Sequence, residues 1–464
     1  MRQPSMKLLW VFSSFGLGAA QNRFAALADQ LGDEYEHVIC AMDGDFEAAR
    51  LIPDSVRWRK LAFDSKRASL ISLGNLWSIR KILARERPAI LLTQNQRGLE
   101  WLLANRGPGA APHVHFEDAV GQEELLDAAD SAAAWARRRA FPGKNRLFVS
   151  SSREIAAAMH ARWGAPADAV RHIPLGLDLA PFREIERLAP TDGDVTTLGV
   201  VGPLTKRKRV DRALRMTATL LERGREVRLL VFGEGPDRAR LEAEARSLGL
   251  GERARFLGAT ADMGAAMAAL DLLVAAADRD HSPQAVIAAM AAGLPVVGAD
   301  VGEIGEILDP ANALFVRPTS DESAMTAAAE LLIADPGVRR AIGAANRARA
   351  VERHDVDVMA RRYKTLFQEV TGETGVLMLP APDAAASRPA EVTVQPGATD
   401  ARAALEAARR ALGPNGRARD ADAPKRLERP HGWGAAADER ATGRVAAEPT
   451  LRERSVKESR SDVA

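Results

Sequence analysis

The sequence has little of what stabilises small secreted domains or anchors a chain in a membrane. Its 464 residues include one cysteine, Cys40, which excludes an intrachain disulfide and fits a reducing compartment. The apolar run Leu8–Phe12 near the N-terminus is too short for the core of a signal peptide and far too short to span a bilayer. We therefore expect a cytoplasmic protein, and a peripheral position at the inner face of the membrane stays open.

An excess of one charge is missing as well. The 64 lysines and arginines almost balance the 62 aspartates and glutamates, so no overall field draws the chain to nucleic acid or to a membrane. Aromatic residues interleaved with basic ones, which would stack on bases, are absent, and this argues against nucleic-acid binding. The eight histidines and one cysteine show no metal-ligand spacing, so we expect no metal site.

The apolar pattern predicts an α/β protein. Short apolar runs alternate with amphipathic segments, as in βαβ units with parallel sheets. We expect two doubly wound, Rossmann-like domains that face a central cleft, with ligands beyond the carboxyl ends of the strands. The strands expected are Leu8–Phe12, His37–Ala41, Ala89–Leu92, His113–Phe116 and Arg146–Ser150, then Thr197–Val201, Val227–Phe232, Ala254–Leu257, Leu272–Ala275, Pro295–Val297 and Leu314–Val316.

Changes in composition divide the chain into four predicted parts. A loop near residue 188 separates a first domain, residues 1–187, from a second domain, residues 188–352. Residues 353–374 are predicted to form a final helix that packs back on the first domain. Residues 375–464 are rich in Ala, Arg, Pro and Asp and contain no Phe or Tyr, so we expect a disordered tail.

Five motifs follow one another in the second domain where strands end and helices begin. Glycine in such turns lets the backbone approach a ligand, and helix N-termini offer aligned amide dipoles to an anion. In chain order the motifs are Gly199-Val-Val-Gly-Pro-Leu-Thr-Lys-Arg-Lys-Arg209, Gly233-Glu-Gly-Pro236, Phe256-Leu-Gly258, Asp280-His-Ser-Pro-Gln-Ala-Val-Ile-Ala-Ala-Met-Ala-Ala-Gly-Leu-Pro295 and Val301-Gly-Glu-Ile-Gly-Glu306.

In this order and spacing the motifs resemble the donor-binding domain of the family-4 (group 1) retaining glycosyltransferases of the GT-B fold, over roughly residues 7–370. The resemblance implies a hexosyltransferase-type enzyme that moves a sugar, with retention, from a UDP-, GDP- or ADP-linked donor to a glycan or lipid-linked acceptor. It places the enzyme in polysaccharide or cell-envelope glycan synthesis. It also implies no cofactor and no metal, because Lys208 and helix dipoles would stabilise the departing diphosphate. Asp280 would hold the sugar hydroxyls, and Phe256–Gly258 would border the nucleobase.

In the second domain, the glutamate pair and one arginine of the family pattern are not kept. The family carries two glutamates eight positions apart, but here Asp280 holds the first position and Ala288 the second, where a ribose would otherwise be bound. Pro203 stands where an arginine is usual, and we expect Arg207 or Arg209 to supply the missing charge. These departures leave open an alternative of another class, a non-catalytic GT-B-fold protein that binds or regulates within a glycan-assembly complex.

The first domain contributes a glycine loop and a strand end. Gly16-Leu-Gly18 resembles the family loop that approaches the donor phosphates and the acceptor, although Ala19 replaces the second glycine of the usual pair. A nicotinamide dehydrogenase is disfavoured because no third glycine follows at the required spacing. His113-Val-His-Phe-Glu-Asp118 ends a strand, and we expect it to point at the cleft, with His115 or Asp118 at the reacting centre. The alternative is that the histidines are structural.

The expected site therefore draws on both domains. A further basic cluster, Arg137–Arg139 with Trp135 and Phe141, is either a solvated helix end or a contact with an anionic membrane surface. The expected catalytic residues are His115, Asp118, Lys208 and Asp280, and the expected donor-binding residues are Gly16, Gly18, Gly202, Lys208, Arg209, Gly233, Leu257, Gly258, Asp280, Pro283 and Glu306.

Overall fold

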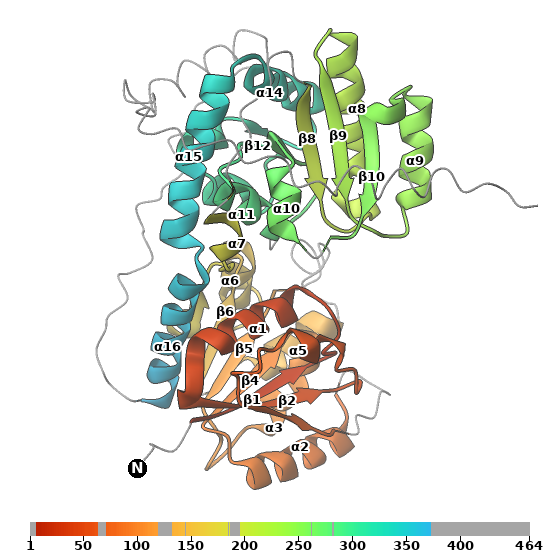
Figure 1. The fold of residues 1–464 in the computed structure, drawn as a ribbon. Helices are drawn as coiled ribbons and strands as arrows, with labels where there is room; N and C mark the ends of the chain where they lie inside the picture. Colours follow the sequence, from red (N-terminus) through yellow and green to blue (C-terminus); the bar gives the residue numbers. More distant parts are fainter. Residues whose placement is uncertain are drawn as a thin grey trace, which may run out of the picture. The chain divides into compact units, whose positions relative to one another are not determined.

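The structure is a computed structural model, and it describes residues 6–63, 71–118, 132–143, 145–183, 185, 195–260, 262–280 and 283–372. The predicted tail, residues 375–464, and the predicted boundary near residue 188 lie outside these described residues. The described part of the chain contains two sheets, and every strand pair in both is parallel (Figure 1). This confirms the α/β class that the alternating pattern predicts.

The first sheet has seven strands in the order β3-β2-β1-β4-β5-β6-β7. The order reverses between β1 and β4, which is the switch point of a doubly wound sheet. Two edge strands, β3 and β7, were not expected from the sequence, because one carries two charged residues and the other is three residues long. The strands are β1 (Met6–Phe12), β2 (Tyr35–Ala41), β3 (Trp58–Leu61), β4 (Ile90–Gln94), β5 (His113–Phe116), β6 (Arg146–Ser150) and β7 (Val170–His172).

The second sheet has six strands in the order β10-β9-β8-β11-β12-β13, with its switch point between β8 and β11. The two sheets therefore share one winding scheme, as expected for a pair of Rossmann-like units. The strands are β8 (Thr196–Val201), β9 (Val227–Phe232), β10 (Ala254–Gly258), β11 (Leu272–Ala275), β12 (Val296–Ala299) and β13 (Val316–Arg317).

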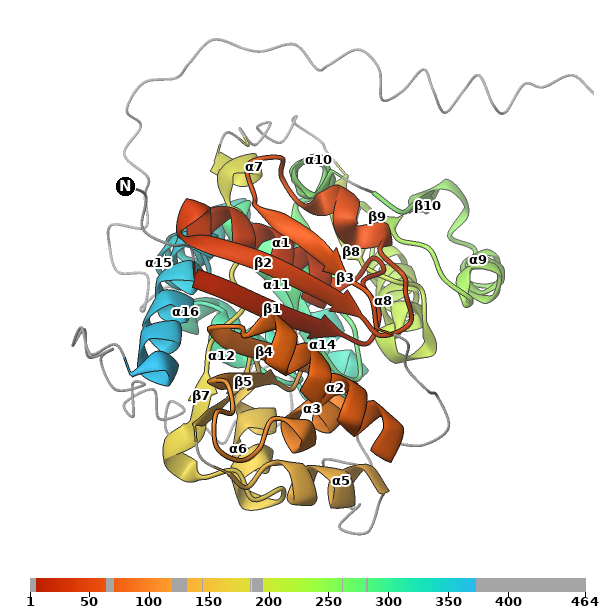
Figure 2. The same cartoon turned by 90° about the horizontal axis from the view of Figure 1, so that it is seen from below.

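Helices cover both faces of each sheet (Figures 1 and 2). None of the helices in the described ranges combines the length and the apolar character that crossing a bilayer requires. The helices are α1 (Ala19–Leu31), α2 (Leu73–Glu86), α3 (Leu99–Ala104), α5 (Ala132–Ala140), α6 (Arg153–Ala161), α7 (Ala180–Arg183), α8 (Val210–Glu222), α9 (Arg238–Ser247), α10 (Met263–Ala268), α11 (Gln284–Ala291), α12 (Ile304–Ile307), α13 (Pro310–Ala313), α14 (Glu322–Ala334), α15 (Pro336–Arg353) and α16 (Val356–Thr371).

Strand β1 shows why the central strands read as unbroken apolar runs. Its side chains alternate between two cores: Trp10 and Phe12 face the core shared with α1 and α16, whereas Leu9 and Val11 face the core shared with α2 and α3. Because helices cover both faces, polar residues have no favourable place in the middle of the strand. In the first sheet the sequence therefore predicts the central strands and misses both edge strands.

The last described helix, α16, returns to the first sheet. Asp355 caps its N-terminus by accepting a hydrogen bond from the amide of Asp357, and Gly372 ends it in the left-handed conformation at φ 73°. Tyr363 lies 5.9 Å from the ring of Phe116, and Met359 is buried in the same core. The apolar face of α16 thus completes the core that β1 and α1 begin.

Candidate functional site

A small pocket lies at the switch point of the second sheet, where β8 and β11 end. Gly202 and Pro203 line it from the end of β8, residues 275–277 line it from the end of β11, and Lys208 and Asp280 contribute the charged side chains. Its volume is about 30 Å³. The carboxyl ends of the strands at a switch point are where doubly wound sheets bind ligands, so the second sheet presents its charged pair at the expected place.

Lys208 and Asp280 form an ion pair in this pocket. The Nζ of Lys208 donates a hydrogen bond of 2.6 Å to Oδ2 of Asp280. Their side chains are 20% and 18% exposed, so a ligand at the strand ends can reach both. The pair joins segments 72 residues apart because β8 and β11 are neighbours in the sheet.

The segment that carries Lys208 differs from the expected helix start. Lys206–Lys208 form a single turn of 3-10 helix, and α8 begins only at Val210. Between them Arg209 adopts the left-handed conformation at φ 47°, which interrupts the helical path. Lys208 therefore lies in a tight turn beside the pocket and not in the first turn of α8.

Glycines let the ends of β8, β9 and β10 lie against one another. The amide of Gly202 donates to the carbonyl of Phe232 over 2.9 Å, and the amide of Gly233 donates to the carbonyl of Gly258 over 2.8 Å. A Cβ atom on Gly233 would stand 1.9 Å from the carbonyl oxygen of Gly202, so no other residue fits there. The predicted glycine motifs are thus placed together at the carboxyl edge of the sheet.

The N-terminus of α11 lies at the same pocket. Pro283 is the N-cap residue, and Ala285 and Val286 in the first turn line the pocket. The amide dipoles of this turn favour an anion near the helix end. Ala288, which stands where the family has its second glutamate, is fully buried in the core and does not line the pocket.

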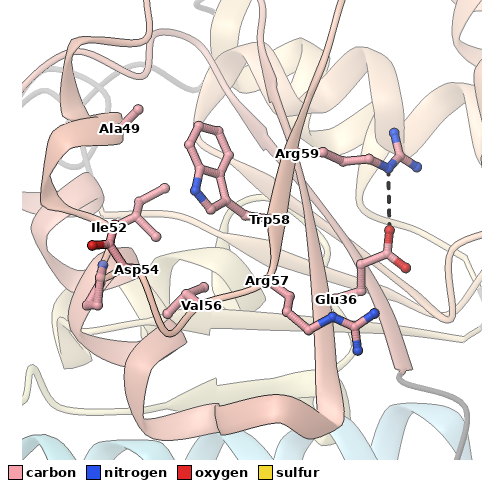
Figure 3. A pocket seen from close by; sticks show the side chains of 9 residues that line it. Glu36, Ala49, Ile52, Asp54, Val56, Arg57, Trp58 and Arg59 are labelled. Atoms are coloured by element: carbon pink, nitrogen blue, oxygen red, sulfur yellow. Dashed lines mark hydrogen bonds and ion pairs between the residues drawn. The ribbon is translucent and has the colours of Figure 1, made fainter.

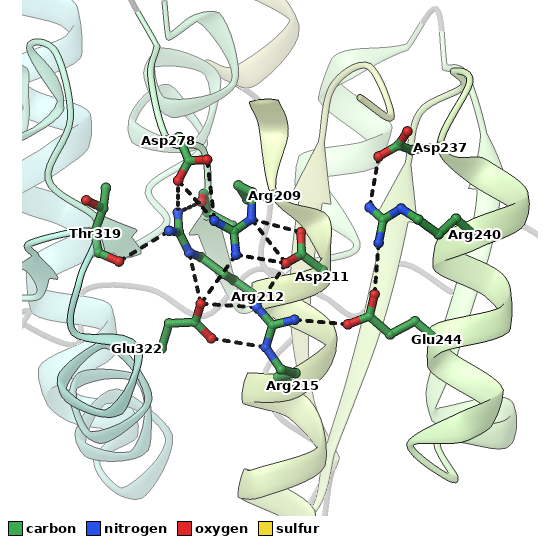
Figure 4. A network of polar contacts seen from close by, with 11 residues as sticks. Arg209, Asp211, Arg212, Arg215, Asp237, Arg240, Glu244, Asp278, Thr319 and Glu322 are labelled. Atoms are coloured by element: carbon green, nitrogen blue, oxygen red, sulfur yellow. Dashed lines mark hydrogen bonds and ion pairs between the residues drawn. The ribbon is translucent and has the colours of Figure 1, made fainter. Parts of the chain in front are cut away.

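Arg209 does not line the pocket but belongs to a network of arginines and carboxylates (Figure 4). Its Nε lies 3.1 Å from Oδ2 of Asp211, and its Nη1 lies 3.2 Å from Oδ1 of Asp278. The hydrogen bond with Asp211 is the largest of the effects that raise the pKa of Arg209. Of the two candidates to replace the arginine missing at Pro203, Arg209 thus binds carboxylates outside the pocket, and Arg207 is exposed and does not line the pocket either.

The network extends along α8. Arg212 pairs with Asp278 over 2.6 Å and with Glu322 over 3.2 Å, and Arg215 pairs with Asp211 over 2.9 Å. Burial of Asp211 opposes its ionisation, but hydrogen bonds from Arg209 and Arg215 outweigh it, so its pKa is lowered. Since Asp278 lies two residues before Asp280, this network fixes one end of the loop that carries the pocket carboxylate. No local motif in the sequence predicts this network.

The remaining donor-domain residues lie apart from the pocket lining. Leu257 is 42% exposed near the end of β10, and the neighbouring Gly258 has φ 81°. Glu306 on α12 pairs with the Nε of Arg153 over 3.3 Å and does not line the pocket. The preceding Glu303 is buried and accepts a hydrogen bond from the backbone amide of Arg153, so the predicted motif contacts the start of α6.

In the first sheet the glycine loop follows β1 at the switch point. The amide of Gly16 donates to Oγ of Ser14 over 3.1 Å, and a Cβ atom on Gly16 would stand 2.6 Å from Oδ2 of Asp45. Gly18 is the N-cap residue of α1 with extended backbone that any residue adopts. A larger residue at either position would meet the end of a side chain, Asp45 at Gly16 and Gln21 at Gly18, and not the backbone.

The two histidines of β5 are buried in the sheet and do not face an open cleft, contrary to expectation. Oγ1 of Thr93 lies 2.9 Å from Nε2 of His113 and 2.8 Å from Nδ1 of His115. Nε2 of His115 lies 3.3 Å from Oε2 of Glu117, which Arg137 also binds. Each of these side chains is at most 1% exposed, because β5 is a central strand with both faces covered.

Asp118 is the accessible group at this strand end. Its Oδ2 accepts from Nη1 of Arg23 over 2.5 Å, and its Oδ1 accepts from the amide and the hydroxyl of Ser151 over 2.8 and 2.9 Å. Burial opposes its ionisation, but the charge of Arg23 and the bonds from Ser151 lower its pKa. The side chain is 15% exposed, so of the two candidates at the reacting centre only Asp118 is accessible.

A larger groove of about 550 Å³ lies at the other end of the first sheet (Figure 3). Glu36, Arg57 and Trp58 line it where β2 and β3 begin. No predicted site residue lies there. Ligands of doubly wound sheets bind at the carboxyl ends of strands, so the smaller pocket of the second sheet is the better candidate despite its size.

Comparison with known proteins matches almost the whole described part of the chain. Residues 20–181 match the family model described as Glycosyltransferase Family 4, and residues 182–349 match the model described as Glycosyl transferases group 1. A 2-deoxystreptamine glucosyltransferase from Streptomyces kanamyceticus is 28% identical over 273 residues, which are 51% of this chain and 68% of that protein. A GDP-mannose-dependent alpha-mannosyltransferase from Mycolicibacterium smegmatis is 29% identical over 289 residues, which are 58% of this chain and 70% of that protein.

Solved structures show the same fold. Alr3699/HepE from Anabaena, in complex with UDP and glucose, superposes with a TM-score of 0.63 at 19% identity over 78% of this chain and 99% of that one. WaaG, a glycosyltransferase involved in lipopolysaccharide biosynthesis, superposes with a TM-score of 0.58 at 18% identity over 79% of this chain and all of that one. The chain therefore belongs to the group 1 glycosyltransferases and is a glycosyltransferase enzyme with the GT-B fold.

Proposed function

We propose that this enzyme transfers a sugar with retention from a nucleotide-sugar donor to a hydroxyl of a glycan or lipid-linked acceptor. The ion pair of Lys208 and Asp280 at the switch-point pocket carries the proposal. A relative is GDP-mannose-dependent, and structural neighbours were solved with UDP or UDP-glucose, which supports a nucleoside diphosphate as the leaving group. We assign the reaction to polysaccharide or cell-envelope glycan synthesis in the cytoplasm.

In this proposal the donor diphosphate lies against Gly202 and Lys208. The bond between the anomeric carbon and the phosphate oxygen breaks, and its electron pair stays on the diphosphate. The acceptor oxygen bonds to the anomeric carbon on the face that the diphosphate leaves, and the acceptor proton passes to the departing phosphate oxygen. The Lys208 ammonium and the first amides of α11 stabilise the growing charge, so no metal and no cofactor are required.

The existing ion pair is compatible with donor binding. A lysine ammonium has three donors, so Lys208 can keep its bond to Asp280 while it donates to a phosphate oxygen. The carboxylate has further acceptor positions for sugar hydroxyls. Because the pocket of about 30 Å³ is far smaller than the ~300–1,000 Å³ of typical ligand sites, the rest of the donor must lie along the strand ends outside it.

For the first domain we propose that Asp118, and not the buried His115, is the group that meets the reacting centre. Its lowered pKa keeps it ionised at neutral pH, where it can accept a hydrogen bond from an acceptor hydroxyl or stabilise positive charge on the sugar. Arg23 and Ser151 hold the carboxylate in one orientation. This assignment rests on accessibility and charge.

The test is a product assay with the full chain. UDP-, GDP- and ADP-linked hexoses of α configuration are supplied in turn with simple glycosides as surrogate acceptors, and NMR reads the anomeric configuration of the product. We expect one nucleotide class to be consumed and an α product. A β product would contradict retention, and turnover that survives Lys208→Ala would contradict the assigned donor site.

A further inference from the structure

Helix α2 exposes two large apolar side chains that the fold does not use. Leu73 is 84% exposed and Trp77 is 61% exposed, one helical turn apart on the same face. The opposite face of α2 already packs on the sheet through Ile79 and its neighbours. A single exposed apolar residue is ordinary, but this helix has an apolar inner face that folding requires and an apolar outer pair that it does not.

Basic side chains continue the same outer face. Arg80, Lys81 and Arg85 follow Trp77 and are exposed, and the Nζ of Lys81 lies 3.3 Å from the centre of the Trp77 ring. Trp77 and Lys81 thus combine an apolar ring with a cation, and such pairs are suited to the boundary between lipid and water. The face therefore runs from an apolar start to a cationic end over a helix about 21 Å long.

Helix α2 and the two helices beside it carry no exposed carboxylate. Helix α3 packs against both α2 and α5, and the structure describes every residue of these three helices (Figure 2). They contain two carboxylates, and both are buried: Glu86 is bound by Arg59 and Arg85, and Glu100 is bound by Asn75. The chain as a whole carries +2, so this local excess of exposed positive charge is a property of the surface and not of the composition.

The basic cluster of α5 divides differently from what the sequence suggests. Trp135 is 58% exposed, but Arg137 is buried against Glu117 with its guanidinium 4.7 Å from the centre of the Trp163 ring, and Phe141 is fully buried. Two of the five residues of that cluster, Arg137 and Phe141, are therefore interior, and Trp135, Arg138 and Arg139 are exposed. Helix α2, which the sequence did not single out, is the more complete amphipathic surface.

We propose that the outer face of α2 docks on an anionic bilayer surface. Leu73 and Trp77 enter the region between headgroups and acyl chains, while Arg80 and Lys81 bind lipid phosphates. This partner fits both features of the face, the exposed Trp and Leu and the neighbouring Lys and Arg with no exposed carboxylate on the three helices. A neutral surface would not use the cations, and an acidic protein would leave the apolar pair in water. The proposal concerns an interaction surface and is independent of the donor chemistry.

The test is cosedimentation of the full chain with vesicles. Two double variants are compared with the wild type, Leu73→Ser with Trp77→Ser and Arg80→Ser with Lys81→Ser. Val351→Ser and Arg340→Ser on α15 serve as controls, because both positions are exposed on a helix outside this surface. Vesicles of phosphatidylcholine alone and vesicles that also contain phosphatidylglycerol are used, and thermal unfolding shows that each variant is folded.

We expect binding to the anionic vesicles that weakens in high salt, with much weaker binding to phosphatidylcholine alone. Each double variant lowers the partition coefficient by roughly tenfold or more, since each removed cation near a charged bilayer contributes several-fold. Equal binding to both vesicle types, unchanged binding of the double variants, or an equal loss in the controls would overturn the proposal. The proposal would also be overturned if the wild type does not bind vesicles and forms a dimer that the variant with Leu73→Ser and Trp77→Ser dissociates. A second copy of the chain would then cover this face.

Discussion

The side chains of Lys208 and Asp280 meet at 2.6 Å at the carboxyl edge of the second sheet, although they lie 72 residues apart in the chain. The contact exists because β8 and β11 are neighbours across the switch point. The carboxylate of Asp280 is the partner of the ammonium that we assign to the diphosphate. Donor binding and this ion pair are thus coupled, and the coupling can be measured.

Asp280→Asn separates the two roles that we assign to this pair. The variant removes a negative charge beside the ammonium that binds the diphosphate, so repulsion of this anion falls and affinity for a free nucleoside diphosphate should stay equal or rise. Transfer should fall by roughly 10- to 100-fold in kcat/KM, because the sugar loses a charged acceptor. Calorimetry with the nucleoside diphosphate and a transfer assay measure the two effects. Glu252→Gln, exposed in the same domain, should change neither, and a parallel loss of both quantities in Asp280→Asn would contradict the division of roles.

Arg209→Gln tests whether this arginine is structural. Its guanidinium bonds with Asp211 and Asp278, so the variant should lower the free energy of unfolding by about 1–2 kcal/mol. Because Arg209 does not line the pocket, affinity for the nucleoside diphosphate should change by less than about threefold. Chemical denaturation and calorimetry measure the two quantities. A large loss of affinity with unchanged stability would restore the role that the sequence suggested.

Gly233→Ala tests the close approach of the strand ends. The added Cβ atom would stand 1.9 Å from the carbonyl oxygen of Gly202, so the turns after β8 and β9 must separate. We expect the free energy of unfolding to fall by more than about 2 kcal/mol, measured by denaturation. Gly224→Ala is the matched control, since Gly224 has φ 74° and no atom near the added group, and it should cost only about 1 kcal/mol. An equal loss of unfolding free energy in the two variants would show that the carbonyl of Gly202 does not restrict the residue at position 233.

The buried His37 makes the free energy of unfolding depend on pH. Burial lowers the pKa of His37 to about 4, whereas in the unfolded chain it is about 6.5. Between these values the unfolded state binds the extra proton, so the free energy of unfolding falls as the pH drops from about 6.5 to about 4. The expected slope from this group is about 1 kcal/mol per pH unit.

The histidine prediction is checked with His37→Gln, whose side chain can still accept the bond that Trp10 Nε1 donates to Nδ1 of His37. Denaturation at several pH values compares the slopes and not the absolute stabilities. The variant should lose the part of the slope that His37 contributes, while the similarly buried His354, with a pKa also near 4, keeps its own part. Identical slopes in the two proteins would show that His37 is not the titrating group.

The sequence predicts the central strands and several site motifs for a physical reason. Strand β9 has the limits that its apolar run predicts, and only Arg228 in it is exposed. Strand β5 also has the predicted limits, although two of its four residues are histidines. The edge strand β3 has no apolar run, because it carries Arg59 and Lys60, and it was not expected. Glycine turns are predictable because close backbone contact excludes every other residue.

What the sequence could not supply depends on contacts distant along the chain. The left-handed conformation of Arg209 and its partner Asp278 follow from how β11 returns beside β8. The burial of His115 follows from the position of β5 in the sheet order, which alternation alone does not give. The spacing of charges on α2 was visible, but only the structure shows which side of the helix the sheet leaves open.

The central claim is that Lys208 binds the donor diphosphate, and calorimetric titration of the full chain with UDP, GDP and ADP tests it most directly. We expect one nucleotide to bind the wild type. Lys208→Ala should weaken that binding by roughly 10- to 100-fold, as loss of a charge-assisted hydrogen bond predicts, and Lys206→Ala, an exposed lysine two residues away, should leave it unchanged. Binding that survives Lys208→Ala, or no binding of any nucleotide by the folded wild type, would contradict the account.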